Sequence, residues 1–299
     1  MMLGKHTLQV YGLLNGIGQV YFSPSLLTSF FILCAIAVES ITLLILTVIG
    51  ALTSHFIAQL TRKPQTDIDQ GLYALNGALV ALFIGSFYEL NLGLWLVTVV
   101  GAALTVPIAK IVFSFKKYKG YTSAFITTTW LIFALLSLLD IDASSASTDQ
   151  HLWLHIPNEL AVLLIGISQV AFINNELSGL LILVAMAMYK PIHALWVIGA
   201  LLVTTGVNSY LGVEQALVER GLYGYNVVLV TLALLHYKNM HWGLVILGGM
   251  TSCVITYVFH GLQLLPLTAP FILSAWLMVY FSGVLGKYCS INVHGSESK

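Results

Sequence analysis

Charged residues are scarce in this chain of 299 residues. They make up 8% of the sequence, whereas soluble domains carry about 25%. The formal net charge is zero, so no basic surface points to nucleic acid as a partner. Hydrophobic residues account for 58% of the chain. This composition argues against an ordinary water-soluble domain and predicts an integral membrane protein that lies in a lipid bilayer.

Cysteine is also rare, with three residues at Cys34, Cys253 and Cys289. They lie far apart, two of them in apolar stretches, and no spacing typical of a metal site occurs. We therefore expect buried thiols rather than a disulfide, a metal site or a bound cofactor. The amino terminus lacks the pattern of a cleavable signal peptide. No nucleophile can be paired with a base, which disfavours a membrane-embedded amidase and any enzyme.

The chain instead contains a long-period duplication. Segments recur 146 to 150 positions later, and the pairs are Gly16–Phe22 with Gly166–Phe172, Val48–Leu52 with Val197–Leu201, Gly71–Val80 with Gly221–Val230, and Thr122–Trp130 with Thr268–Trp276. In an apolar chain, such a duplication is typical of membrane transport proteins built from two equivalent halves. The sequence predicts one repeat over residues 1–145 and a second over 146–299, joined by the connector 140–157 within one membrane domain.

Long apolar runs are expected to be helices. They fall at 25–38, 41–60, 71–88, 91–115 and 122–139, and again at 177–189, 191–209, 221–236, 241–259 and 270–286. A crossing helix needs roughly 20 apolar residues. The shorter pieces 8–18 and 158–168 are therefore predicted to be half-membrane helices that end at the bilayer centre. The predicted fold is all-α, with two inverted repeats of five transmembrane helices, each with an additional short half-membrane helix.

Basic residues indicate the orientation of the chain. With a cytoplasmic amino terminus, most loop cations fall inside, namely Arg62, Lys63, Lys116, Lys117, Lys119, Lys190, Lys238 and Lys287. The acidic, serine-rich stretch 140–149 then falls outside. The opposite orientation would place nearly all the loop lysines outside, against the positive-inside rule. Arg220 is the exception, with Glu219 beside it. Both termini are therefore predicted to be cytoplasmic.

Polar residues that recur within the apolar zone are neutral. They are Gln19 and Gln169, Asn76 and Asn226, and Thr122 and Thr268. An unpaired amide in hydrocarbon costs several kcal/mol, so each needs a partner or a pore. We interpret the asparagines as hydrogen-bonding groups between helices, and the glutamines and threonines as pore lining.

Phe22 and Phe172 follow the two glutamines by three positions. Phenylalanine in a membrane protein usually packs against lipid or another helix. At the end of a non-spanning helix, however, two facing rings would form the flat walls of a slot. Threonine hydroxyls and backbone carbonyls would supply acceptors along its edges. Such a slot suits urea, which is planar and uncharged and has four N–H donors, and it excludes a hydrated ion.

The chain resembles the urea transporter family. The resemblance rests on the paired Gly-x-x-Gln-Val-x-Phe segments, the paired Gly-Leu-Tyr-x-x-Asn-x-x-Leu segments, and Thr268-Ala269-Pro270-Phe271 before Trp276. It covers essentially the whole chain. It implies a homotrimer whose protomers each contain a pore for passive urea transport without a coupled ion. The short chain is similar to bacterial members, which implies the cell inner membrane.

By this resemblance, the filter and its apolar walls are assigned to twelve residues. They are Gln19, Val20, Phe22, Leu75, Leu79, Thr122, Gln169, Val170, Phe172, Tyr225, Leu229 and Thr268. The first-half signature departs from the family pattern and keeps only Thr122 and Phe125. Leu75 also stands where an aromatic residue is typical. These departures leave the solute preference open.

Two alternatives remain open. An aquaporin is disfavoured because no Asn-Pro-Ala box occurs, and an ammonium channel because His55 and His193 lie near span ends, where we expect hydrogen-bonded packing residues. Ammonia or water could still be additional permeants. An ion-coupled secondary transporter would need a buried carboxylate, and no Asp or Glu lies in the middle of an apolar run.

Overall fold

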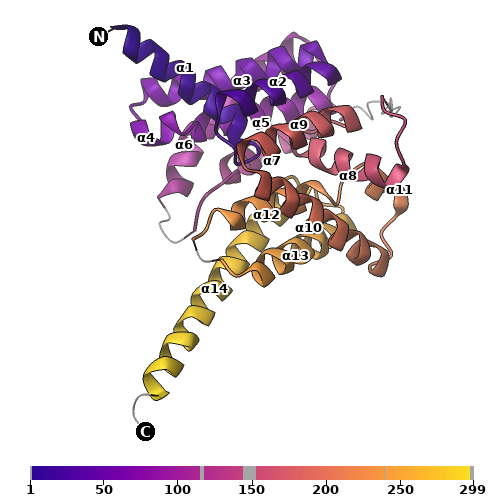
Figure 1. Ribbon diagram of the computed structural model, residues 1–299. Helices are drawn as coiled ribbons and strands as arrows, with labels where there is room; N and C mark the ends of the chain where they lie inside the picture. The colour runs from indigo at the N-terminus through magenta and orange to yellow at the C-terminus, as the bar shows by residue number, and fades with distance from the viewer. Residues whose placement is uncertain (1, 115–117, 144–152, 239, 297–299) are drawn as a thin grey trace.

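Every regular element in the described part of the chain is helical. The computed structural model describes residues 2–114, 118–143, 153–238 and 240–296, with side chains from 10 to 284 (Figure 1). The first half contains α1 (Met2–Gln19), α2 (Leu26–Glu39), α3 (Ile41–Leu60), α4 (Gln65–Asp69), α5 (Leu72–Phe87), α6 (Leu92–Phe113) and α7 (Ser123–Leu138). The second half contains α8 (Asn158–Ser168), the 3₁₀ turn η1 (Gln169–Ala171), α9 (Glu176–Tyr189), α10 (Pro191–Tyr210), α11 (Gln215–Glu219), α12 (Tyr225–Leu235), α13 (Trp242–Gly261) and α14 (Ala269–Ser296).

The predicted apolar runs are confirmed as helices, with bounds that differ by a few residues except at α14, which continues past the predicted end at 286 to Ser296. Residue 289, one of the three cysteines, lies outside the part whose side chains are described. Cys253 is buried, and Cys34 is partly buried, with both thiols free. The amino-terminal helix is longer than the predicted piece 8–18, whereas α8 matches 158–168.

Only some of these helices are long enough to cross a membrane on their own. By length and composition, four of the described helices qualify, namely α3, α6, α10 and α13. A fifth crossing is possible through α8, η1 and α9, which are bent by 77° at their break. The other apolar helices have 10 to 17 residues when only the residues with described side chains are counted. Two of them, α5 and α12, are buried almost throughout their length, so protein rather than lipid surrounds them.

Local sequence explains where the helices begin. Asn91 and Asn175 cap α6 and α9 by accepting the backbone N–H three residues later. Ser40 both ends α2 and caps α3. Short polar residues therefore divide the long apolar sequence into separate helices.

The two halves of the chain pack side by side (Figure 1). Helix α3 packs closely on α5, where a Cβ on Gly50 would lie 2.4 Å from the carbonyl oxygen of Gly77. Helices α2 and α9 pack against each other across the halves, and Ser178 Oγ donates to the Ala35 carbonyl at 2.7 Å. The Tyr21 hydroxyl donates to the Ile167 carbonyl at 3.0 Å, so the turns that follow α1 and α8 lie close together in one central region.

Candidate functional site

Two threonine hydroxyls from different halves meet in this central region. Thr122 Oγ1 and Thr268 Oγ1 lie 2.7 Å apart, and both residues are buried. Thr122 is the N-cap residue of α7, and Thr268 directly precedes α14. The structure thus brings together two residues that are 146 positions apart in sequence.

The repeated asparagines hold the helices that follow these threonines. Asn76 Oδ1 on α5 accepts the Phe125 N–H of α7 at 2.8 Å. Asn226 Oδ1 on α12 accepts the Phe271 N–H of α14 at 3.1 Å. Each amide satisfies one of the backbone donors left free at a helix N-terminus. The prediction that the asparagines bond helices together is confirmed.

The two Gln-Val-x-Phe segments form equivalent turns. Phe22 and Phe172 both adopt left-handed backbone conformations, with φ of 54° and 58°. Their N–H groups donate to the carbonyls of Gln19 and Gln169, each at 3.0 Å. A residue with a Cβ pays about 1–2 kcal/mol for this conformation, so two such turns at repeated positions mark a specialised site.

The two phenylalanine rings belong to separate aromatic clusters. Phe22 contacts Phe271, Tyr121 and His236, with ring centroids 5.6–6.0 Å apart. Phe172 contacts Phe125, Phe83 and Phe87 at 5.8–6.0 Å. Each ring therefore packs on the phenylalanine three positions after the threonine of the other half. That the two rings face each other across a slot stays a prediction.

A cavity of about 550 Å³ adjoins the Phe22 cluster. Six of the twelve expected site residues line it, namely Gln19, Val20, Phe22, Leu75, Thr122 and Leu229. The same cavity is lined by Lys119, Lys190, Asp67 and His236. The structure thus brings half of the predicted set to one hollow that is also lined by two lysines and one carboxylate.

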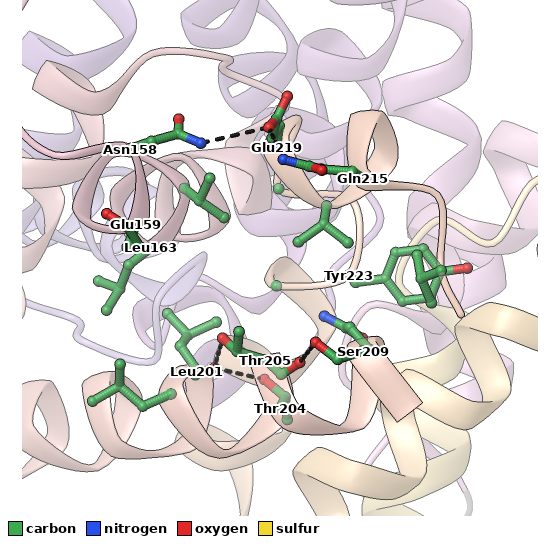
Figure 2. A pocket seen from close by; sticks show the side chains of 17 residues that line it. Asn158, Glu159, Leu163, Leu201, Thr204, Thr205, Ser209, Gln215, Glu219 and Tyr223 are labelled. Atoms are coloured by element: carbon green, nitrogen blue, oxygen red, sulfur yellow. Dashed lines mark hydrogen bonds between the residues drawn. The ribbon is translucent and has the colours of Figure 1, made fainter. Parts of the chain in front are cut away.

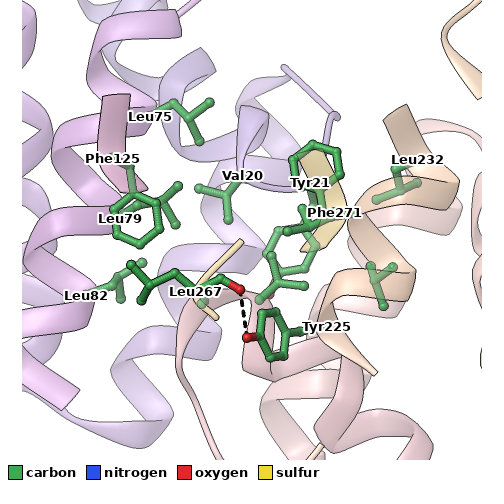
Figure 3. Close-up of a cluster of buried hydrophobic side chains, with 14 of the residues drawn as sticks. Val20, Tyr21, Leu75, Leu79, Leu82, Phe125, Tyr225, Leu232, Leu267 and Phe271 are labelled. Atoms are coloured by element: carbon green, nitrogen blue, oxygen red, sulfur yellow. Dashed lines mark hydrogen bonds between the residues drawn. The ribbon is translucent and has the colours of Figure 1, made fainter. Parts of the chain in front are cut away.

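The other six residues are not among those that line this cavity. Leu79, Val170 and Tyr225 are buried in the apolar core, and Figure 3 shows Leu79 and Tyr225 on either side of Val20. The Tyr225 hydroxyl donates to the Leu267 carbonyl at 2.7 Å (Figure 3). Gln169 Nε2 lies 3.5 Å from Asn174 Oδ1, a long hydrogen bond. Thr268 contacts Thr122, which lines the cavity, and Phe172 lies in the second aromatic cluster.

The structure contains two ionisable features that the sequence did not predict. The first is a histidine pair, His193 and His236, with ring centroids 5.1 Å apart. His236 Nδ1 donates to the Leu232 carbonyl at 2.8 Å, and its ring contacts Phe22. The residues are too distant in sequence for any spacing to reveal the pair.

The individual histidine predictions have different outcomes. His55 is hydrogen-bonded to Gln59 at 2.8 Å, as expected of a packing residue. The His193 ring packs on His236, but its buried Nδ1 has no hydrogen-bond partner among the described residues, so the expected hydrogen bond is missing at that atom.

The second missed feature is Glu176, which is fully buried at the start of α9. One carboxylate oxygen accepts the Leu154 N–H, and the other has no partner among the described residues. Asn175 beside it donates to Glu39 Oε2. The sequence suggested no buried carboxylate because Glu176 lies at the edge of its apolar run, where an exposed helix start was equally plausible.

The fold and the site thus define a helical membrane protein with several membrane-spanning helices. It has two matched turns and a central pair of threonine hydroxyls. The urea transporter family model matches residues 10–158 and 160–298. The chain belongs to the urea transporter family, a family of membrane transport proteins rather than enzymes.

Curated relatives show partial similarity. Urea transporter 1 of mouse is 36% identical over 74 residues, which cover 25% of this chain and 19% of that protein. Urea transporter 1 of sheep and of goat are each 37% identical over 82 residues, or 26% of this chain and 21% of theirs. The chain thus aligns with about a fifth of the length of these relatives.

Proposed function

We propose that the chain conducts urea passively across a membrane, along a path past the Thr122–Thr268 pair. The single observation that carries the proposal is this pair of buried hydroxyls, which has an aromatic cluster on either side. The adjoining cavity supports it, because Gln19, Phe22 and Thr122 line one hollow. Family membership and the relatives named urea transporter 1 support urea as the permeant.

Hydroxyls suit this permeant chemically. A threonine hydroxyl has one donor and two acceptor lone pairs, so it can accept a urea N–H and donate to the urea carbonyl. In the observed state the two hydroxyls satisfy each other at 2.7 Å. A passing urea molecule would replace this hydrogen bond with bonds of its own. A hydrated ion would lose its water against apolar rings that offer no compensating charge. The path would therefore select urea over ions.

The proposed architecture is a pair of inverted repeats, 1–145 and 146–299, with the path between them. Recurring helix lengths support it, since α2 and α9 have 14 residues, α3 and α10 have 20, and α4 and α11 have 5. The matched left-handed turns support it as well. The positive-inside rule favours a cytoplasmic position for the cavity lined by Lys119 and Lys190. In that orientation both termini are cytoplasmic. From the family resemblance we also propose that the chain forms a homotrimer in the cell inner membrane.

Passive conduction predicts the behaviour of purified protein in proteoliposomes. Stopped-flow urea influx should exceed that of empty vesicles and should rise linearly with urea at low concentrations. Uncouplers should leave it unchanged, because no ion gradient drives it. Formamide, ammonia and water flux in the same preparation would establish the other permeants. Influx that collapses when a proton or sodium gradient is removed would rule out the channel.

Ion-coupled transport is the second candidate, and Glu176 is the observation that favours it. A buried carboxylate oxygen without a partner is the kind of group that binds a proton or sodium ion. We expect instead that Glu176 fixes the segment before α8 through the Leu154 N–H. Glu176→Gln keeps a carbonyl oxygen for that bond, so urea flux should stay within about twofold of wild type. Loss of gradient-driven urea accumulation in this variant would favour coupling.

A further inference from the structure

Two tryptophan side chains form reciprocal hydrogen bonds between the halves of the chain. Helix α7 packs on α5 and α6 of its own half, and α14 packs on α12 and α13. Trp130 of α7 nevertheless donates its indole N–H to the Leu265 carbonyl of the second half, at 3.0 Å. Trp276 of α14 donates its indole N–H to the Lys119 carbonyl of the first half, at 2.9 Å. Each tryptophan therefore holds the backbone of the opposite half.

The two acceptor carbonyls lie in the segments that carry the central threonines. We call residues 119–122 and 265–268 the threonine segments, because each ends at one of these threonines. In each segment the acceptor carbonyl belongs to the first residue, and the tryptophan follows eight positions after the threonine. The two bonds thus tie each threonine segment to the helix that follows the other threonine.

Each threonine segment also contains a turn that depends on contacts around it. Tyr121 and Leu267 stand directly before the threonines, and both adopt left-handed backbone conformations with φ of 44° and 45°. This conformation costs a residue with a Cβ about 1–2 kcal/mol. It persists only where neighbouring groups hold the backbone. The indole N–H of the opposite half supplies such a contact at the carbonyl two positions earlier.

One of the threonine segments is a wall of the cavity beside Phe22. Lys119, Tyr121 and Thr122 all line this cavity. The Trp276 ring also packs on Tyr118, another residue that lines the cavity, with ring centroids 5.8 Å apart. Movement of this segment would therefore change the width of the proposed urea path beside the threonine pair.

Side-chain hydrogen bonds are not matched throughout the two halves. On α3, His55 is bonded to Gln59 at 2.8 Å. The positions 149 residues later are Thr204 and Asn208 on α10, which line a second cavity, of about 580 Å³ (Figure 2). There Thr204 donates instead to the Leu201 carbonyl at 3.0 Å (Figure 2). The repeat alone therefore does not account for the matched tryptophan bonds.

We propose that Trp130 and Trp276 are positioning residues that set the spacing of the two threonine hydroxyls and so decide how large an amide can pass. This inference rests on the proposed urea path. Neither tryptophan is among the described residues that line the cavity beside Phe22, so each acts through the backbone of a threonine segment. Without the two bonds the segments separate more readily. Urea then loses simultaneous contact with both hydroxyls, and bulkier solutes meet less resistance.

Solute selectivity in proteoliposomes tests the proposal. Trp130→Phe and Trp276→Phe each keep an aromatic ring and delete the indole N–H. In either variant we expect the permeability ratio of urea to N,N′-dimethylurea to fall by about fivefold, the factor that corresponds to one ordinary hydrogen bond. A variant that is only less stable loses flux of both solutes equally, so its ratio stays at the wild-type value. An unchanged ratio would overturn the proposal.

The matched control is Trp196→Phe on α10. Trp196 is partly buried against the core, as Trp276 is, and its indole N–H makes no hydrogen bond to the described residues. The same chemical change should therefore leave the permeability ratio at the wild-type value. If the ratio falls as far in Trp196→Phe as in Trp276→Phe, the bonds to the threonine segments are not its cause.

Cross-linking measures the spacing without any transport. In Thr122→Cys/Thr268→Cys the sulfurs replace hydroxyls that lie 2.7 Å apart, and mild oxidation should join them. Peptide mass spectrometry measures the rate, which should fall by about fivefold when Trp130→Phe and Trp276→Phe are added. An equal or faster rate would overturn the spacing role. Wild-type vesicles that conduct no urea would refute the proposed function, whereas the cross-linking rate would still decide the spacing role.

Discussion

Replacing both central threonines with valine should lower urea flux by about tenfold, which corresponds to about 1.4 kcal/mol of barrier. Valine has nearly the shape of threonine and lacks the hydroxyl. A urea molecule at Thr122 and Thr268 would then lose its hydrogen-bond partners in a buried place. Stopped-flow measurement on proteoliposomes of matched protein content gives the flux.

Single variants separate a transport role from a structural one. Thr122→Val alone leaves the Thr268 hydroxyl buried without its 2.7 Å partner, which costs about 1–3 kcal/mol of stability. The double variant leaves no such orphan and should recover stability. If the hydroxyls act on urea, flux in the double variant stays low although stability recovers. Recovery of flux together with stability would show that the pair only joins the two halves.

Asn76→Leu and Asn226→Leu should each destabilise the protein by about 2–4 kcal/mol. Both side chains are fully buried, and each replacement leaves an N–H at the start of α7 or α14 without its acceptor. These helix starts carry the threonines, so urea flux should fall as well. Chemical unfolding in detergent measures the loss of stability.

Tyr225→Phe is the control for the asparagine variants. It deletes a hydrogen bond of 2.7 Å to the Leu267 carbonyl, but that oxygen still accepts from Asn226 Nδ2 at 3.2 Å. No buried group is left without a partner, so the loss should be about 1 kcal/mol. If Tyr225→Phe costs as much as Asn226→Leu, the helix-start N–H is not what the asparagine stabilises.

The His193–His236 pair and the burial of Glu176 could not be predicted from the sequence. His193 and His236 come from different helices, and nothing in their spacing predicts a contact. Glu176 begins a helix, where a carboxylate is favourable whether exposed or buried. Burial depends on what packs over a residue, and that information is in the tertiary structure.

The sequence by itself determined the helical class, the positions of most helices, the membrane character and the family. These follow from the length and spacing of apolar runs and from repeated motifs, which are local or directly comparable properties. It also identified Thr122 and Thr268 as an equivalent pair and the asparagines as inter-helix hydrogen-bonding groups.

Only the tertiary structure decided which of these residues meet. It put the two threonine hydroxyls in contact, assigned Phe22 and Phe172 to separate clusters, and buried Leu79 and Tyr225 in the core. Repeated sequence predicts equivalent backbone, but close packing depends on the volume and the partners of each side chain, so the contacts of equivalent residues differ between the two halves.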